Sequence, residues 1–273
     1  MISEKQFLTL PACEKCKNKG KYNIRCNSEE QQEEHGTAAG EIVTIICSAC
    51  RANRRRREMF LENENFEPAL RFYELDDYDL PDEGQTIPYK KTLTSLQLAH
   101  DLINDFEGSL IKPGGFIMVY GGGRTGKSIL SHIFARESYL QGYSCDIVSL
   151  SELIVTLSNR IQGGVIKVDD QVVFDIDDFV NLSLLIIDDF SLVNDYFDRA
   201  DIRRGVILNI LKRRSKAGKP TIINSQLTLK ELFAKPIVDA KKLPYDFPTI
   251  IDKNFKALHL HGKFKNKIPL GNS

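Results

Sequence analysis

The sequence lacks two features that would place it in other classes of protein. No run of apolar residues approaches the roughly 20 residues of a membrane-spanning helix, and residues 1–5 lack the apolar core of a secretory signal peptide. Net charge is absent too, because 37 basic side chains balance 37 acidic ones. We therefore expect a cytoplasmic protein without a membrane span, in which any nucleic-acid binding depends on local basic patches.

Length and composition allow one domain of ordinary size and a smaller one. The chain has 273 residues, of which 42% are hydrophobic and 27% charged, as in globular proteins. Its six cysteines indicate metal binding rather than disulfides if the chain is cytoplasmic. The motifs described below predict a zinc-ribbon domain at 1–60, a linker at 61–95 and an ATPase domain at 96–273.

Four of the cysteines form two C-x-x-C pairs that predict the zinc ribbon. Each pair makes a tight turn that presents two thiolates to one tetrahedral ion, and two pairs complete a closed Cys₄ site. Roughly 30 residues separate the pairs, more than is typical of this pattern, so the polar stretch 27–35 is expected to form an extended hairpin tip. The zinc would be structural, because four thiolates leave no open coordination position. The predicted ligands are Cys13, Cys16, Cys47 and Cys50.

Two alternatives to this ligand set remain open. Cys26 and His35 lie between the pairs, and either is able to replace one of the four cysteines. Fully reduced, metal-free cysteines are the other alternative. Residues 41–46 predict the strand that leads into the second pair.

An arginine run, residues 54–57, follows the second pair. One interpretation is the solvated face of a short helix, and the other is contact with a nucleic-acid backbone or an acidic protein surface. The acidic stretch 29–34 partly neutralises the run, so the sequence does not decide between them.

Residues 121–128 fit the phosphate-loop pattern G-x-x-x-x-G-K-[ST], with a predicted strand before and a helix after. Glycines let backbone N–H groups turn toward a polyphosphate at the N-terminus of that helix. Lys127 would reach the β- and γ-phosphates of ATP, the Ser128 hydroxyl would hold Mg²⁺, and Arg124 is an additional candidate phosphate contact. The predicted nucleotide-binding residues are Gly121, Gly122, Gly123, Arg124, Thr125, Gly126, Lys127 and Ser128.

Apolar runs that alternate with helical patterns predict an α/β fold, with a parallel sheet covered by helices on both faces. The segment 162–180 is irregular and acidic and predicts an insertion. The predicted strands lie at 116–120, 143–150, 184–187, 221–223 and 257–261, and the predicted helices at 92–106, 129–135 and 201–217.

Polar side chains at two strand ends predict the remaining parts of an ATPase site. An aspartate at the end of a buried strand opposite a phosphate loop is placed to orient Mg²⁺, which assigns that role to Asp188. Asp189, one residue on, is the candidate that polarises the attacking water. Asn224 and Gln226, at the end of another strand, are candidates for sensing the γ-phosphate, and spacing does not choose between them.

The order of these motifs resembles that of DnaC/DnaI-type helicase loaders, which are AAA+ ATPases of the group that also contains the IstB transposition helper. The resemblance covers nearly the whole chain and is most specific over residues 116–232. It is carried by the cysteine pairs, the arginine run, the phosphate loop, Leu-Ile-Ile-Asp-Asp-Phe at 185–190, and the segment 211–225 with its Arg-Arg pair before Gly-Lys-Pro-Thr.

The resemblance implies an AAA+ P-loop domain, preceded by a zinc ribbon, that uses ATP, Mg²⁺ and Zn²⁺. It further implies an ATPase whose N-terminal domain engages a hexameric replicative helicase and whose AAA+ domain contacts single-stranded DNA. Self-assembly with ATP and a replication initiator protein as a further partner are implied as well. Of the arginine pair, Arg213 and Arg214, one is expected to face the nucleotide interface or DNA, with a solvated helix face as the alternative.

The chain departs from the family at two points that bear on catalysis. The family usually ends its fourth strand with Thr-Asn where this chain has Ser225-Gln226, so Gln226 is the positional match and Asn224 its rival. AAA+ assemblies normally insert an arginine from a neighbouring subunit, whereas the corresponding segment 251–256 carries Lys253. Because lysine lacks the bidentate fork of arginine, we expect hydrolysis that is weak or depends on a partner.

Two other functions fit parts of the same sequence. An IstB-type transposition helper would share the AAA+ core, but the family's transposition helpers lack a zinc ribbon. A nucleotide-gated adaptor with negligible turnover would bind ATP and a partner, and the lysine at Lys253 favours it.

Overall fold

In the computed structural model the chain forms two compact units, divided between Asn63 and Glu64. Of the described residues of the predicted linker, 61–63 belong to the smaller unit, and 64, 66–80 and 86–95 belong to the larger one. None of the described helices is long and apolar enough to cross a membrane. The structure describes residues 21–25, 28, 42–46, 48–64, 66–80, 86–153, 155, 167–168, 171–172, 176–190, 202–228, 255–261 and 263–264.

The smaller unit contains a hairpin and a helix. Strands β1 (Lys21–Arg25) and β2 (Ile42–Ile46) pair antiparallel, and β2 confirms the strand predicted before the second cysteine pair. Helix α3 (Ser48–Glu62) carries the arginine run. Arg54 is exposed and donates from Nε to Glu58 Oε1 at 2.9 Å, an i, i+4 pair of the kind that stabilises an exposed helix by only about 0.3–0.5 kcal/mol.

The larger unit is built on a five-stranded sheet in which every neighbouring pair is parallel, in the order β10-β4-β9-β8-β5. Each predicted strand is present, with its ends shifted by no more than two residues. Parallel strands place their carboxyl ends at one edge of the sheet, so this edge collects the residues that follow each strand. The strands are β4 (Phe116–Tyr120), β5 (Cys145–Ser149), β8 (Leu184–Asp188), β9 (Thr221–Ser225) and β10 (Lys256–His259).

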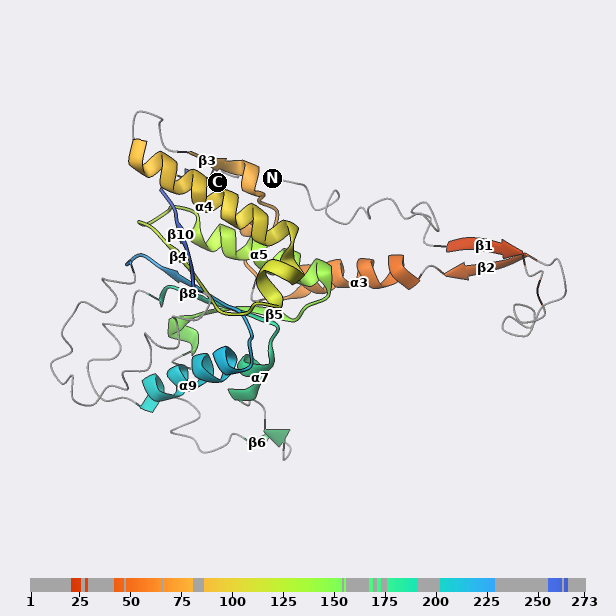
Figure 1. The fold of residues 1–273 in the computed structure, drawn as a ribbon. Coiled ribbons are helices and arrows are strands. Elements are labelled where there is room, and N and C mark those ends of the chain that lie inside the picture. The colour runs from red at the N-terminus through yellow and green to blue at the C-terminus, as the bar shows by residue number, and fades with distance from the viewer. Residues whose placement is uncertain are drawn as a thin grey trace, which may run out of the picture. The chain divides into compact units, whose positions relative to one another are not determined.

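Helices cover both faces of this sheet, as the sequence predicted (Figure 1). Helices α4 (Thr86–Asn104) and α5 (Lys127–Gln141) lie over one face, and α7 (Ile176–Asn181) and α9 (Ile202–Lys216) over the other. A π-helix, η3 (Phe106–Ile111), follows α4 and confirms that helical structure extends beyond residue 104. The core under α7 and α9 includes Phe179, Leu185, Ile187, Ile210, Leu211 and Ile223, all buried.

The acidic segment 162–180 is not irregular throughout, contrary to the prediction. Two short strands, β6 (Lys167–Val168) and β7 (Gln171–Val172), pair antiparallel within it. At its end, α7 buries Phe179 and Val180 in the core beside α9. The sequence did not indicate α7, because a helix of six residues is too short to show a clear apolar period. Two of its six residues, Asp177 and Asp178, are also acidic.

Arg214 is fully buried and does not line the pocket described below, so it is not the member of the arginine pair that faces the nucleotide interface or DNA, and that expectation stays a prediction for Arg213 alone. Its guanidinium donates to the carbonyl oxygens of Phe179 at 2.6 Å, Leu182 at 2.9 Å and Pro220 at 2.5 Å. Nε donates to Thr221 Oγ1 at 3.0 Å. Burial lowers the pKa of Arg214 to about 10, which leaves it charged at neutral pH. Arg214 therefore joins the end of α7 to the start of β9.

Candidate nucleotide-binding site

The phosphate loop connects β4 to α5 as predicted. Gly126 has a left-handed conformation, φ 86°, immediately before the helix begins at Lys127. A Cβ on Gly121 would lie 2.2 Å from the Leu260 carbonyl oxygen, so the close approach of the chain just after β10 requires glycine there. Beside Gly122 and Gly123 there is open space for at least 4 Å around such a Cβ. The loop is therefore closely packed against the chain at Gly121 and open at Gly122 and Gly123, which leaves room for a polyphosphate close to its backbone.

Lys127 is held inside this loop by the loop's own carbonyl groups. Its Nζ donates to Gly121 O at 3.0 Å and to Gly122 O at 2.8 Å. The side chain is 8% exposed, and burial lowers the pKa of Lys127, an effect that the charges of Asp188 and Asp189 oppose. The ammonium group is thus directed into the loop, where a phosphate oxygen would compete for its protons.

A pocket of about 780 Å³ opens in front of the loop. One side consists of the phosphate loop and the start of α5, together with Asp189 and Gln226 from the ends of β8 and β9. The other side consists of Glu67, Leu70 and Asp79, which lie in the predicted linker. We call residues 66–79 the strap. Sequence reasoning found the first side and missed the second.

The strap consists of short elements that lie along α5 and β11. Two 3₁₀ turns, η1 (Pro68–Leu70) and η2 (Leu75–Asp77), precede strand β3 (Tyr78–Asp79). Strand β3 pairs antiparallel with β11 (Lys263–Phe264), and the Tyr78 hydroxyl donates to His261 O at 2.9 Å. Burial raises the pKa of the Tyr78 hydroxyl, which stays protonated as this donor. The aromatic residues of the strap, such as Phe66, Phe72 and Tyr73, are the feature of its sequence that favours docking over a free linker.

His132 connects the strap to the phosphate loop. Its Nδ1 donates to Ser128 O at 2.7 Å, and its Nε2 accepts from the Glu67 N–H at 3.0 Å, which fixes the neutral ring in one tautomer. Burial lowers the pKa of His132, in agreement with a neutral ring. Phe66 meets the ring edge-on, with centroids 6.2 Å apart. The first turn of α5 and the start of the strap therefore share one buried side chain.

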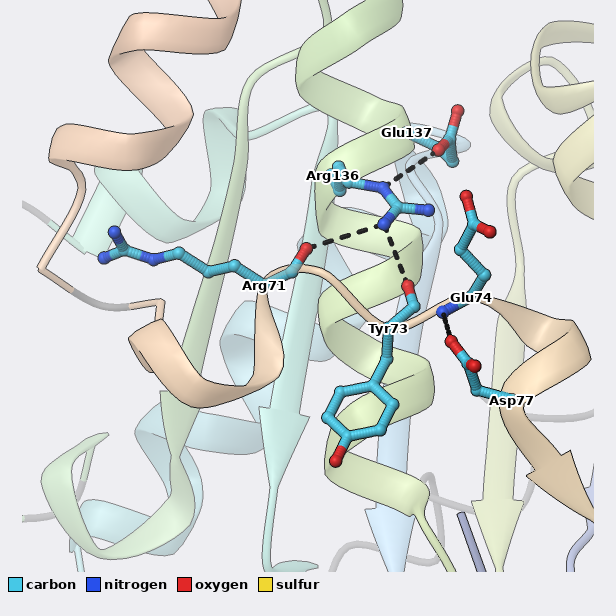
Figure 2. Close-up of polar contacts among 6 residues, drawn as sticks. All are labelled: Arg71, Tyr73, Glu74, Asp77, Arg136 and Glu137. Carbon is cyan, nitrogen blue, oxygen red and sulfur yellow. Dashed lines mark hydrogen bonds and ion pairs between the residues drawn. The ribbon is translucent and has the colours of Figure 1, made fainter. Parts of the chain in front are cut away.

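Arg136, one turn further along α5, holds the middle of the strap (Figure 2). Its Nη1 donates to Tyr73 O at 2.8 Å and, more weakly, to Arg71 O at 3.5 Å. Its Nε donates to Glu137 Oε1 at 3.2 Å, so a carboxylate offsets the charge of this nearly buried guanidinium. Because the carbonyls of an irregular segment need partners when they are buried, Arg136 explains how the strap stays on the helix.

The two aspartates differ in environment. Asp188 ends β8, and its Oδ1 accepts from Asn224 Nδ2 at 3.0 Å and from the Asp189 N–H at 2.9 Å. Asp189 has a left-handed backbone, φ 54°, which turns its side chain toward the pocket that it lines. Partial desolvation and then the charge of Asp188 raise the pKa of Asp189, as expected for a carboxylate suited to polarise water.

Gln226 and Asn224 occupy different places. Gln226 is exposed and lines the pocket near Asp189. Asn224 is fully buried within β9, where it donates to Asp188 Oδ1 and to Ser131 Oγ. β9 lies between β4 and β8, an order that the sequence did not reveal, and this order puts Asn224 beside Asp188.

Hard oxygen ligands for Mg²⁺ are present beside the phosphate loop. Ser128 lines the pocket, whereas Asp188 does not line it and directly precedes Asp189, which does. Asp188 Oδ1 is occupied by two N–H donors, and among the described residues Oδ2 receives no hydrogen bond. The Ser128 hydroxyl lies at the start of α5, on the pocket wall. A carboxylate and a hydroxyl fit Mg²⁺, which is bound through one or two protein ligands plus phosphates.

Several predicted ligands lie outside the described residues. Among the part of the chain that the structure describes, no group of three or more His, Cys, Asp or Glu side chains is placed to hold a metal ion. The helix α3 contains Cys50, but its side chain is not described. Zinc binding therefore stays a prediction, as does a catalytic role for Lys253. The residues outside are Cys13, Cys16, Cys26, His35, Cys47 and Lys253.

Comparison with solved structures defines the class of fold. The chain is similar to a putative primosome component from Streptococcus pyogenes serotype M3, at 22% identity and a TM-score of 0.51, over 73% of this chain and 91% of that one. For DnaI the identity is 20%, the TM-score 0.50, and the coverage 73% and 94%. For the DnaC helicase loader the identity is 18% and the TM-score 0.50, over 71% of this chain and 100% of that one.

The larger unit thus shares its fold with DnaC and DnaI, as predicted. The chain also matches a replication initiator DnaA bound to AMPPCP and single-stranded DNA, at a TM-score of 0.50. It spans about half (50%) of that DnaA chain. No family model matches the chain, and no curated protein matches it.

Proposed function

We propose that this protein is an ATP-dependent loader that places a hexameric replicative helicase on single-stranded DNA. The observation that carries the proposal is the pocket in which the phosphate loop, Asp189 and Gln226 converge, within a fold shared with DnaC and DnaI. The whole-chain resemblance, with its N-terminal cysteine pairs, supports the helicase as the partner.

In this proposal the phosphate loop binds the triphosphate of ATP through backbone N–H groups and Lys127. Ser128 and Asp188 would hold Mg²⁺, which would supply positive charge to offset that of the phosphates. Arg124 is exposed on the pocket wall with φ 61° and is placed to reach a phosphate from outside the loop. The strap opposite supplies Leu70 as an apolar contact for the rest of the nucleotide.

Hydrolysis is assigned to the two polar residues that line the pocket at the strand ends. Asp189 polarises the attacking water, and Gln226 holds that water and senses the γ-phosphate. Burial of Asn224 within β9 favours Gln226 over Asn224 for the sensing role.

Replacing Asp189 by asparagine is expected to lower kcat for ATP hydrolysis by about 10²–10⁴-fold, because the base is lost. Nucleotide affinity should stay within threefold of wild type, since the phosphate loop is unchanged. Asp79→Asn is the matched control, because Asp79 lines the same pocket from the strap. Equal turnover in Asp189→Asn and wild type would remove Asp189 from the mechanism.

The partner is tested with the full chain and a hexameric replicative helicase. Gel filtration should show a complex of the two, and added ATP and single-stranded DNA should change its stability or stoichiometry. Filaments on duplex DNA in the absence of any helicase complex would instead support the IstB-type transposition helper.

The lysine at Lys253 favours a second candidate, a nucleotide-gated adaptor with negligible turnover. Hydrolysis measured with and without helicase and single-stranded DNA separates the two. A rate that rises with these partners supports the loader, whereas tight ATP binding with no turnover in any mixture supports the adaptor.

The zinc prediction is tested by metal content. Purified protein is expected to hold one zinc ion per chain, which the double variant Cys13→Ser, Cys16→Ser loses because two of four thiolates are gone. Cys26→Ser is the control that distinguishes the alternative ligand set, and it should retain the ion. Zinc lost from Cys26→Ser would instead place Cys26 among the ligands.

A further inference from the structure

We propose that Ser131 and Asn224 form a buried hydrogen-bonded bridge that positions the Asp188 carboxylate for Mg²⁺. The proposal rests on the proposed nucleotide-binding function and assigns both residues a positioning role rather than contact with the reacting atoms. Neither residue lines the pocket, and both are fully buried.

The bridge runs from the phosphate-loop helix to the strand that carries Asp188. Ser131 lies on α5, one turn after Lys127. Its Oγ accepts from Asn224 Nδ2 at 2.8 Å, and the same nitrogen donates to Asp188 Oδ1 at 3.0 Å. Three elements of the larger unit, α5, β9 and β8, are therefore joined through one side-chain amide.

The orientation of the amide follows from the partners. An ionised carboxylate only accepts hydrogen bonds, so the amino group of Asn224 must face Asp188. The Ser131 hydroxyl accepts the second amide proton, which holds the amide in this orientation. Asn224 Oδ1 is buried and receives no hydrogen bond from the described residues. If Ser131 were absent, a flip that satisfies Oδ1 elsewhere would remove the donor from Asp188.

The bridge restricts Asp188 in a way that suits a metal ligand. Asp188 Oδ1 accepts from Asn224 and from the Asp189 N–H, so one oxygen of the carboxylate is fixed by two donors. This fixes the direction of Oδ2, which receives no hydrogen bond among the described residues. Partners that orient a metal ligand in this way typically account for 10–100-fold in metal affinity.

The test measures how much Mn²⁺, as a probe for Mg²⁺, the full chain requires to bind AMPPCP. Free Mn²⁺ is followed by its electron paramagnetic resonance signal, and metal-free nucleotide binding is measured in EDTA. Ser131→Ala is expected to raise the Mn²⁺ requirement about tenfold. Asn224→Leu, which removes both hydrogen bonds at similar volume, should raise it at least as much. Metal-free AMPPCP affinity should change by less than threefold in both.

The matched control is Ser138→Ala, because Ser138 is also fully buried on α5 but bonds Tyr143 O at the far end of the helix. It should leave the Mn²⁺ requirement unchanged, and unfolding curves establish that each variant is folded. Folded Ser131→Ala with a wild-type Mn²⁺ requirement would overturn the proposal even if Asn224→Leu failed to fold. Wild-type protein that binds no nucleotide at any Mn²⁺ concentration would instead overturn the proposed function.

Discussion

Replacement of Lys127 by alanine is expected to weaken ATP binding about 100-fold. Lys127 directs its ammonium into the phosphate loop through Gly121 and Gly122. A hydrogen bond to a charged group contributes about 1.5–3 kcal/mol, and 1.4 kcal/mol corresponds to a factor of ten in affinity. The measurement is a titration with AMPPCP, which avoids turnover.

Two further variants separate loss of the charge from loss of the fold. Lys127→Met keeps the buried stem of the side chain and should lose nearly as much affinity as Lys127→Ala. Lys112→Ala removes an exposed lysine whose partner is Glu107, and it should bind AMPPCP like wild type. Unaltered affinity in both Lys127 variants would contradict the phosphate-loop assignment.

Replacement of Arg214 by alanine is expected to cost about 3–5 kcal/mol in the free energy of unfolding, the cost of breaking a buried charged network. The variant would leave the carbonyls of Phe179, Leu182 and Pro220 without their donor. Unpartnered buried carbonyls cost about 1–3 kcal/mol each where water does not reach them. Urea denaturation followed by circular dichroism measures the change.

The neighbouring arginine supplies the control. Arg213 forms an ion pair with Asp177, and both side chains are 42% exposed. Exposed pairs contribute about 0.2–1 kcal/mol, so Arg213→Ala should unfold almost like wild type. A similar, small decrease in the free energy of unfolding in both variants would mean that Arg214 does not hold α7 to β9.

The sequence predicted those parts of the fold that short-range patterns determine. Runs such as 184–187 are buried on both faces, so they are apolar without interruption and are recognised as strands of a covered parallel sheet. The phosphate loop is local as well, because its glycines, Lys127 and Ser128 are contiguous between one strand and one helix. The position of Asp188 and Asp189 at the end of a buried strand was predictable for the same reason, because the apolar run directly precedes them in the sequence.

Features that depend on contacts between distant segments were not predictable. The choice between Asn224 and Gln226 required the strand order, which places β9 between β4 and β8. Arg214 belongs to an arginine pair for which the sequence offered a nucleotide or DNA contact or a solvated face, and its burial depends on contacts with α7, 33 or more residues earlier. The strap looked like a linker because its partners, His132 and Arg136, lie more than 60 residues further along the chain.

The helicase-loader proposal is tested most directly on closed circular single-stranded DNA. A closed helicase ring cannot thread onto a closed circle unless the ring opens, so helicase retained on the circle reports loading. With wild-type protein and ATP we predict several-fold more retained helicase than without the protein, and no increase with Lys127→Ala. Equal retention with wild-type protein, with Lys127→Ala and without either would contradict the proposal.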